Sequence, residues 1–332
     1  MKIAIIYSLP TRRAKQSHYL ETDEDTEHSA RLVLSAVESK GAAAFLVPVS
    51  EDDAEDKIGK IRADLIIDLI EWTGLDTPLS IAAVTRIEQT GIPFTGANAN
   101  NFAMTTDKHR MKQVLLEHNL PTARWQEFRI GSEPVRPDFT YPVIVKLTLE
   151  HCSIGLSHDA VVSHAQDLSR LVARDIQTFN QPVIAEEFIT GREFQVTVLD
   201  RPSGLTVLPP AEIFFSNTEG FLTYGGRWDE TNPDYKTSSI SVGNLTPSLA
   251  RKINTVALDT FTKLKFFDYA RLDIRVRDED IFILEANANP GLDDDPEYGI
   301  TVSYKALGMT FADFIWEIVL SALKRFKQYQ LA

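Results

Sequence analysis

Short apolar runs alternate with amphipathic stretches over the first hundred residues. The runs predict strands covered on both faces, at Lys2–Tyr7, Ala44–Val47, Leu65–Leu69 and, between two glycines, Gly91–Gly96. Between them, Thr26–Lys40 has apolar residues three or four apart and Gly41 just past its end, which predicts a helix, as does Thr77–Gln89. This alternation of strand and helix predicts an open, mostly parallel sheet.

A second group of elements follows from residue 106 onward. Helices are expected at Thr106–His118, Ala165–Asn180, Thr246–Lys265 and, with a clear 3.6-residue apolar stripe, Phe311–Phe326. Strands are expected at Pro142–Lys146, Pro182–Ala185, Ala270–Arg277 and Ile281–Glu285, and further segments at Glu193–Leu199 and Leu205–Phe215. The fold class is therefore predicted as α/β, with an α+β part, and no internal repeat interrupts it.

Length and charge narrow the classes of protein that fit. A chain of 332 residues suggests two or three units, or one large α/β unit. Its net charge of −13 argues against nucleic acid as a main partner, because binding to a phosphate backbone needs a basic face. No run of 18 apolar residues exists, and the first apolar run is too short for a signal peptide, so we expect no membrane association and a cytoplasmic location. The single cysteine, Cys152, excludes an intrachain disulfide and a cysteine-based zinc site.

The C-terminal third places acidic and amide side chains on two neighbouring predicted strands. Residues two apart in a strand share a face, so Asp273 lies with Arg271, and Glu285 lies with Asn287. If the strands pair as a hairpin across residues 278–280, Asp273 and Glu285 converge. Two carboxylates and an amide oxygen are ligands that suit Mg²⁺ or Mn²⁺. The alternative is a half-exposed hairpin with ordinary polar positions, but the spacing and the Asn-x-Asn-Pro-Gly turn that follows favour the metal site.

Two lysines and a small polar loop are candidate phosphate ligands. Lys108 opens a predicted helix and Lys146 ends a predicted strand; either lysine alone is more often a solvated surface residue. Lys146 follows three apolar residues, so its stem is expected to be buried and its ammonium to point into a cleft. The loop at residues 150–157 contains Gly155 and can offer backbone N–H groups to phosphate. The chain contains neither a P-loop nor a dinucleotide-binding glycine motif.

Glu186 and Glu187 end another predicted strand and precede a short linker. Such a strand end suits a purine, with backbone groups at its edge and a carboxylate at the ribose hydroxyls. Two surface glutamates followed by a turn fit the same residues equally well in isolation.

Taken in order, these segments resemble the ATP-grasp superfamily, and most closely the D-alanine–D-alanine ligase family and its relatives. The resemblance covers most of the chain and is strongest at Thr106–Lys108, Pro142–Lys146, Glu186–Phe194, Ala270–Asp273 and Leu284–Gly291. It implies a three-domain architecture, with an N-terminal α/β domain at 1–105, a central domain at 106–190 and a C-terminal domain with the metal site at 191–332. It also implies a homodimer formed through the N-terminal domain.

The resemblance implies ATP and Mg²⁺, with Mn²⁺ as the alternative ion. The implied nucleotide-binding residues contact the phosphates, the adenine and the ribose: Lys108, Lys146, Gly155, Glu186, Glu187, Ile189 and Glu193. Asp273, Glu285 and Asn287 would bind the metal ion. The implied catalytic residues are Ser153 in the loop over the terminal phosphate, Arg271 at the anionic tetrahedral intermediate, and Arg227, where the family usually has a phosphate-directed lysine.

Three segments depart from the family pattern. The Glu-Ser pair that holds the first alanine in the family is missing from Leu9–Lys15, and the His-Gly…Gly-Glu-Asp-Gly segment is replaced by Ile70–Thr77. After Gly291, the family's carboxylate-binding residues are replaced by Leu292–Glu297, which includes Asp293, Asp294 and Asp295. An acidic pocket wall there is expected to repel a carboxylate and favour an amine or a cation. The ATP-binding residues are therefore expected to be retained and the amino-acid site to be changed.

The predicted reaction is the ATP-dependent joining of an amino acid or small carboxylic acid to an amine. Phosphorylation makes the carboxylate electrophilic, and the amine then displaces phosphate; lysines, an arginine and Mg²⁺ suit this chemistry. Two alternatives remain open: a kinase or synthase of the same superfamily that acts on another acceptor, and a non-catalytic nucleotide-binding relative.

Overall fold

The N-terminal part of the chain forms a three-stranded parallel sheet. The computed structural model describes residues 1–216, 220–235 and 237–330. The sheet has the order β2-β1-β3, with β1 at Lys2–Ser8, β2 at Ala43–Val49 and β3 at Leu65–Leu69. One face packs against α1 (Glu21–Ser39) and α10 (Phe311–Gln330), and the other against α2 (Ala54–Gly59) and α3 (Thr77–Gln89). Because both faces are covered, the strands are mostly apolar, and Asp68 of β3 is a buried exception.

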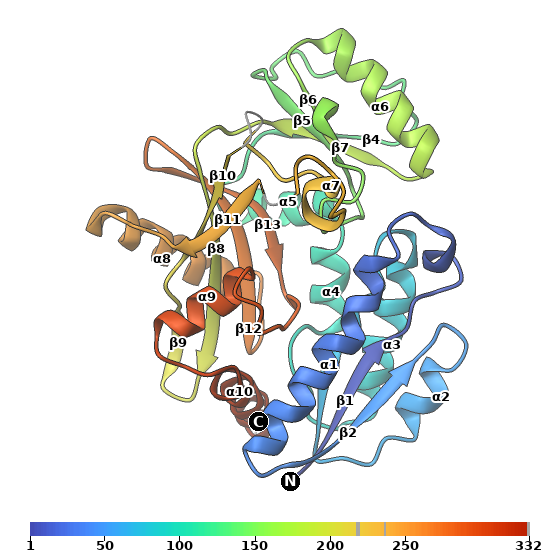
Figure 1. Ribbon diagram of the computed structural model, residues 1–332, viewed down its shortest axis with the longest axis vertical. Coiled ribbons are helices and arrows are strands. Elements are labelled where there is room, and N and C mark those ends of the chain that lie inside the picture. The colour runs from blue at the N-terminus through green and yellow to red at the C-terminus, as the bar shows by residue number, and fades with distance from the viewer. Residues whose placement is uncertain (217–219, 236, 331–332) are drawn as a thin grey trace.

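A four-stranded antiparallel sheet forms the upper part of the molecule in Figure 1. Its order is β4-β7-β5-β6, with β4 at Trp125–Phe128, β5 at Val143–Leu147, β6 at Val161–Val162 and β7 at Val183–Glu187. Helix α6 (Ala165–Phe179) packs against it. Helices α4 (Ala99–Thr105) and α5 (Lys108–Glu117) connect the first sheet to this one.

The largest sheet is antiparallel and occupies the left side of Figure 1. Its strands are β8 (Arg192–Arg201), β9 (Gly204–Val207), β10 (Ala211–Phe215), β11 (Ser238–Val242), β12 (Tyr269–Arg277) and β13 (Asp280–Asn287). They run in the order β11-β10-β8-β12-β13, and β9 pairs with β8. The helices of this part are α7 (Tyr224–Trp228), α8 (Pro247–Lys263) and α9 (Gly299–Ala306).

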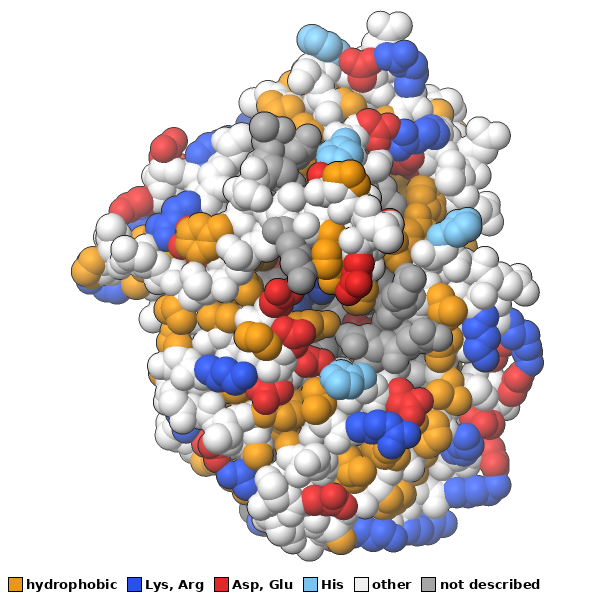
Figure 2. Space-filling view, viewed as in Figure 1, with side chains coloured by type: hydrophobic (Ala, Val, Ile, Leu, Met, Phe, Trp, Pro, Cys, Tyr) orange, Lys and Arg blue, Asp and Glu red, His pale blue; other side chains and the backbone are white. Residues whose placement is uncertain are grey.

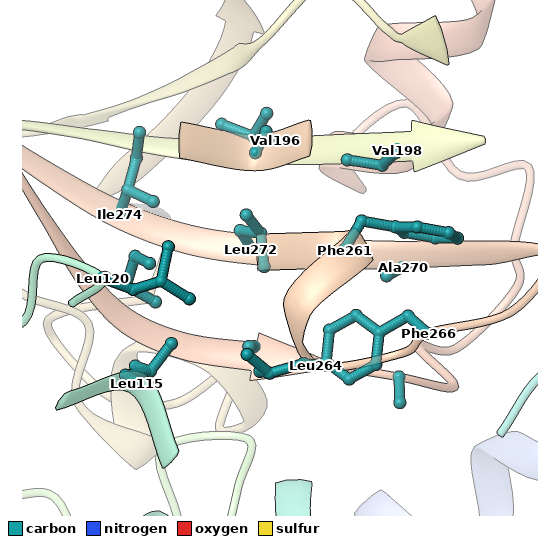
Figure 3. Close-up of a cluster of buried hydrophobic side chains, with 14 of the residues drawn as sticks. Leu115, Leu120, Val196, Val198, Phe261, Leu264, Phe266, Ala270, Leu272 and Ile274 are labelled. Atoms are coloured by element: carbon teal, nitrogen blue, oxygen red, sulfur yellow. The ribbon is translucent and has the colours of Figure 1, made fainter. Parts of the chain in front are cut away.

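A buried apolar cluster holds this sheet against α5 and α8 (Figure 3). The labelled side chains come from two strands and from the helices and turns beside them: Leu115, Leu120, Val196, Val198, Phe261, Leu264, Phe266, Ala270, Leu272 and Ile274. Alternate residues of β12 face this cluster, which leaves Arg271, Asp273 and Arg275 on the opposite face of the strand. The packing of the core therefore determines where the charged residues point.

Most predicted elements are present, and three predictions need correction. Residues 91–96 form no strand; a single bridge joins Phe94 to Ile66. Thr106 and Asp107 lie outside the helix predicted there, because the Asp107 carboxylate accepts a hydrogen bond from the N–H of Arg110 and caps α5. The segment at residues 205–215 divides into β9 and β10 around two prolines, which cannot donate ladder hydrogen bonds. Sequence patterns missed α2, α4, α7, α9, β4, β6 and β11.

No single helix in the described ranges is long and apolar enough to cross a membrane, although α9 and α10 pass the length and composition criteria as a pair bent by 94°.

Asp68, near the end of β3, gives the fold a pH dependence. Its side chain is fully buried, and its Oδ2 has no hydrogen-bond partner among the described residues. Burial raises the pKa of Asp68 to about 7. At pH values between the pKa of Asp68 in the unfolded chain and its pKa in the folded protein, the folded protein keeps a proton that the unfolded chain has released. The free energy of unfolding therefore falls as pH rises through this range.

We expect this loss to be on the order of 4 kcal/mol across the window from about pH 4 to about pH 7. Asp68→Asn removes the titrating group, so its free energy of unfolding should change less over that window. Urea denaturation of both proteins at several pH values measures the difference. Parallel pH profiles would show that Asp68 does not titrate in this range.

Candidate active site

One cavity lies where the three sheets approach one another, and it contains nearly all the predicted site residues. Twelve of the thirteen line it: Lys108, Lys146, Ser153, Glu186, Glu187, Ile189, Glu193, Arg227, Arg271, Asp273, Glu285 and Asn287. Figure 2 shows acidic side chains gathered near the middle of this face of the molecule. Gly155 does not line the cavity. Its φ is +76°, and an added Cβ would lie 2.8 Å from the Leu147 side chain. Glycine is therefore required at this position by the backbone conformation of the turn and by the close approach of Leu147.

The predicted carboxylate pair is formed by β12 and β13. The two strands are antiparallel neighbours, with Asp273 directly opposite Glu285 and Arg271 opposite Asn287. The Nδ2 atom of Asn287 lies 3.2 Å from Oδ2 of Asp273. The two carboxylates therefore lie opposite one another across the hairpin, as expected, and both line the cavity.

Each carboxylate of the pair has a cationic neighbour. Asp273 accepts two hydrogen bonds from Arg271, at 2.8 Å from Nε and 3.1 Å from Nη2. Glu285 Oε1 lies 3.0 Å from the ammonium of Lys108. Burial alone would raise the pKa of Glu285, but Lys108 and Lys146 outweigh burial and hold this pKa below its usual value. Glu285 is therefore ionised at neutral pH and able to act as a ligand.

The donor set fits a hard divalent cation. Asp273, Glu285 and Asn287 offer oxygen atoms, which Mg²⁺ and Mn²⁺ prefer. Among the residues that the structure describes, no group of three or more Asp, Glu, His or Cys side chains is arranged to hold a metal ion. The two carboxylates would thus need the amide, water and phosphate oxygens to complete a coordination shell, as is common for Mg²⁺.

Lys146 extends from β5 into the cavity beside Glu186 of β7. Its ammonium lies 2.5 Å from Oε1 of Glu186, and Lys112 of α5 lies 2.6 Å from Oε2. Burial on its own would raise the pKa of Glu186, but Lys112 and Lys146 outweigh it and lower this pKa to about 2. Glu186 is only 2% exposed, so its reading as a surface glutamate is wrong. Sequence reasoning missed Lys112, although it lies one helical turn after Lys108 and hence on the same side of α5.

The linker after β7 is held against β12 by Arg275. This guanidinium is 4% exposed, lies 2.7 Å from Oε2 of Glu193 and donates a 2.7 Å hydrogen bond to the carbonyl oxygen of Ile189. Glu187, at the end of β7, accepts a hydrogen bond from the N–H of Thr140. Arg275 therefore fixes the segment predicted to bind adenine and ribose relative to β12, the strand that carries Asp273.

The loop at residues 150–157 lies over the cavity and is tied to α7. The indole N–H of Trp228 donates to the carbonyl oxygen of Cys152 at 3.1 Å, and Cys152 and Ser153 both have φ near +60°. Nδ1 of His151 lies 2.9 Å from Sγ of Cys152. Burial would lower the pKa of His151, but Cys152 and Glu71 outweigh burial and raise this pKa to about 9. Burial would raise the pKa of the Cys152 thiol, but His151 and Arg227 outweigh burial and lower it. The two side chains therefore favour an imidazolium beside a thiolate, a pair that carries no net charge.

The acidic segment after Gly291 does not form the expected pocket wall. Asp293, Asp294 and Asp295 do not line the cavity. The Asp294 carboxylate accepts a hydrogen bond from Tyr304 and lies 2.8 Å from the ammonium of Lys305 on α9, so it points away from the site. Asp293 is 6% exposed. The expectation that these aspartates form a wall of the cavity is therefore wrong.

A different acidic residue, which sequence reasoning did not single out, stands at this end of the cavity. Glu71 follows β3, and its N–H donates to the hydroxyl of Ser8 at 3.0 Å. Its carboxylate lies 3.7 Å from Nε2 of His151, and its side chain is 36% exposed. The segment at residues 9–15, where the family's Glu-Ser pair was sought, does not reach the cavity.

Comparisons with known proteins point to one family of relatives. The family model described as D-ala D-ala ligase C-terminus matches residues 115–320. A protein of Sinorhizobium fredii, named uncharacterized protein y4sG, is 28% identical over 242 residues, which is 72% of this chain and 69% of that protein. The D-alanine–D-alanine ligase of Herminiimonas arsenicoxydans is 26% identical over 311 residues, covering 90% and 87% of the two chains.

The overall structure is similar to a solved ligase. The crystal structure of the D-alanine–D-alanine ligase from Bacillus anthracis complexed with ATP superposes with a TM-score of 0.75 at 18% identity, covering 99% of each chain. The predicted ATP-grasp architecture is therefore confirmed.

Proposed function

The chain belongs to the D-alanine–D-alanine ligase family, and from this premise we propose that it is an ATP-dependent, ADP-forming ligase that joins a carboxylate to an amine. One observation carries the proposal: Asp273 and Glu285 face one another in the same cavity that Lys146 and Lys108 enter. This arrangement of oxygen donors beside ammonium groups suits a nucleoside triphosphate with its divalent cation.

The three parts 1–105, 106–190 and 191–332 are proposed as domains, since each contains one of the sheets.

The proposed reaction proceeds through an acyl phosphate. Lys108 and Lys146 hold the phosphates, and a carboxylate oxygen of the substrate attacks the terminal phosphorus atom, which releases ADP. The amine then attacks the acyl carbon, phosphate departs, and Arg271 stabilises the negative charge on the carbonyl oxygen. A divalent cation held by Asp273, Glu285 and Asn287 would neutralise phosphate charge. The loop at residues 150–157 would exclude water, because water would hydrolyse the acyl phosphate.

An ADP-release assay tests this proposal. Purified protein with MgATP is screened against amino acids of both configurations and small carboxylic acids, singly and in pairs with amines. We expect ADP release that depends on an amine and a covalent amide product by mass spectrometry. Release without an amine would indicate a kinase or synthase acting on another acceptor, and nucleotide binding without release would indicate a non-catalytic protein.

The amino-acid substrate is proposed to differ from that of the ligases. Residues 9–15 lack the family's Glu-Ser pair and lie outside the cavity, where Arg13 is paired with Asp76. Glu71 instead lines the cavity, and its backbone N–H is held by a hydrogen bond to the hydroxyl of Ser8. We propose that Glu71 receives the ammonium group of the substrate, while Arg271 lies at its carboxyl end.

Glu71→Gln tests this assignment. The change removes the charge but keeps the size, so we expect the KM for the amino acid found in the screen to rise about tenfold or more, with the KM for ATP unchanged. Steady-state kinetics measures both values. Glu51→Gln, a change at a glutamate that pairs with Arg12 outside the cavity, is the matched control. Equal amino-acid KM values in wild type and Glu71→Gln would exclude Glu71 as the anchor.

A further inference from the structure

A buried lysine beneath the cavity has no place in the reaction described so far. The Lys112 side chain is 1% exposed and does not line the cavity. Its ammonium lies 2.6 Å from Oε2 of Glu186 and 2.7 Å from the hydroxyl of Thr122. That hydroxyl donates to the carbonyl oxygen of Ile283 on β13, at 2.8 Å. Lys112 is therefore fixed between the central sheet and the strand that carries Glu285.

The position of Lys112 matters because Glu186 lies between two lysines. Lys146 contacts the other carboxylate oxygen, and its side chain is 14% exposed toward the cavity. Two ammonium groups around one carboxylate leave one net positive charge. Lys112 does not line the cavity and Glu186 is 2% exposed, so Lys146 is the most exposed charge of the three toward the cavity.

Removing Lys112 would change this balance without touching the cavity wall. Glu186 would then have Lys146 as its one close cation, and the pair would be neutral. Two neighbouring ion pairs add no net charge, because Lys108 pairs with Glu285 and Arg275 pairs with Glu193. A polyanion in the cavity would meet a weaker positive field, in surroundings where burial makes such fields strong.

We propose that Lys112 is a positioning residue of the nucleotide site. It neutralises Glu186 from the side away from the cavity, so that Lys146 presents its full charge to the polyphosphate of ATP. The inference rests on the proposed function, since it concerns the same nucleotide. It gives Glu186 the role of an anchor for two lysines in place of the adenine contact that the family resemblance implies. Burial lowers the pKa of Lys112, and Glu186 beside it offsets part of this cost of burying the charge.

Charge restoration separates this electrostatic role from a packing role. Lys112→Met keeps the length of the side chain and removes its charge, so the dissociation constant of the magnesium complex of AMP-PNP is expected to rise about tenfold or more. Lys112→Met/Glu186→Gln removes one charge of each sign and leaves Lys146 unpaired. We expect this double variant to bind within about threefold of wild type. Isothermal titration calorimetry measures each constant.

Control variants keep the result interpretable. Lys263→Met removes a partly exposed lysine that pairs with Asp259, and its affinity should equal that of wild type. Thermal unfolding reports whether each variant is folded, and Lys112→Gln replaces Lys112→Met if the latter is not. Wild-type affinity in the single variant, or a double variant that binds no better than the single one, would overturn the inference.

The same titrations separate this inference from the proposed function. If the wild-type protein fails to bind the magnesium nucleotide, the proposed function fails and the role of Lys112 fails with it. If the wild type binds nucleotide and releases ADP while Lys112→Met is unaffected, only the role of Lys112 is refuted.

Discussion

Asp273→Asn and Glu285→Gln are each expected to lower turnover by at least about a thousandfold. Each change removes one of the two carboxylates that face each other across β12 and β13. An amide is a weaker ligand for a hard cation than a carboxylate, so the charge on the phosphates would be poorly neutralised. ADP release with excess MgATP measures turnover, and Mn²⁺ binding followed by electron paramagnetic resonance measures the metal site separately.

A variant on the same hairpin serves as the control. Asp280 is exposed at the start of β13, so Asp280→Asn changes the net charge equally and should leave turnover unchanged. Thermal unfolding should show that all three variants are folded. Wild-type turnover in either Asp273→Asn or Glu285→Gln, in excess Mg²⁺, would remove these two residues from the proposed metal site.

Arg271→Met is expected to lower kcat by about a hundredfold to a thousandfold, with little change in the KM for ATP. Arg271 lines the same cavity as Glu71 and lies two residues before Asp273 on β12. Its guanidinium is oriented by two hydrogen bonds to Asp273, which keeps it directed along the cavity. A donor placed where negative charge develops acts mainly on the transition state, so the loss should appear in kcat.

Arg271→Lys distinguishes geometry from charge. Lysine keeps the charge but cannot form the two parallel hydrogen bonds to Asp273, so we expect it to recover little of the lost activity. Steady-state kinetics of wild type and both variants decides the point. An unchanged kcat in Arg271→Met would exclude a role in stabilising the intermediate, and full activity in Arg271→Lys would show that charge alone suffices.

The sequence was most informative where local rules decide the structure. Short apolar runs predicted β1 and β3 because strands buried on both faces need no polar positions. The pairing of Asp273 with Glu285 could be predicted because a short turn between two adjacent strands leaves few possible registers. In the same way, three apolar residues before Lys146 were enough to predict its buried stem.

The errors arose where distant residues decide the structure. The predicted pocket wall at residues 293–295 is absent because Tyr304 and Lys305, on a helix that was not predicted, bind Asp294. Lys112 was overlooked because its burial depends on Glu186, which is more than seventy residues away in the chain. Glu71 enters the cavity through a loop whose path is set by Ser8. Composition and periodicity carry no information about such contacts.

A crystal structure with Mn²⁺ and AMP-PNP tests the central claim most directly. We predict an anomalous difference peak beside the carboxylates of Asp273 and Glu285, with the phosphates in contact with Lys108 and Lys146 and the adenine beside Ile189. A metal ion or triphosphate bound elsewhere, with Asp273 and Glu285 still paired to Arg271 and Lys108, would contradict the account.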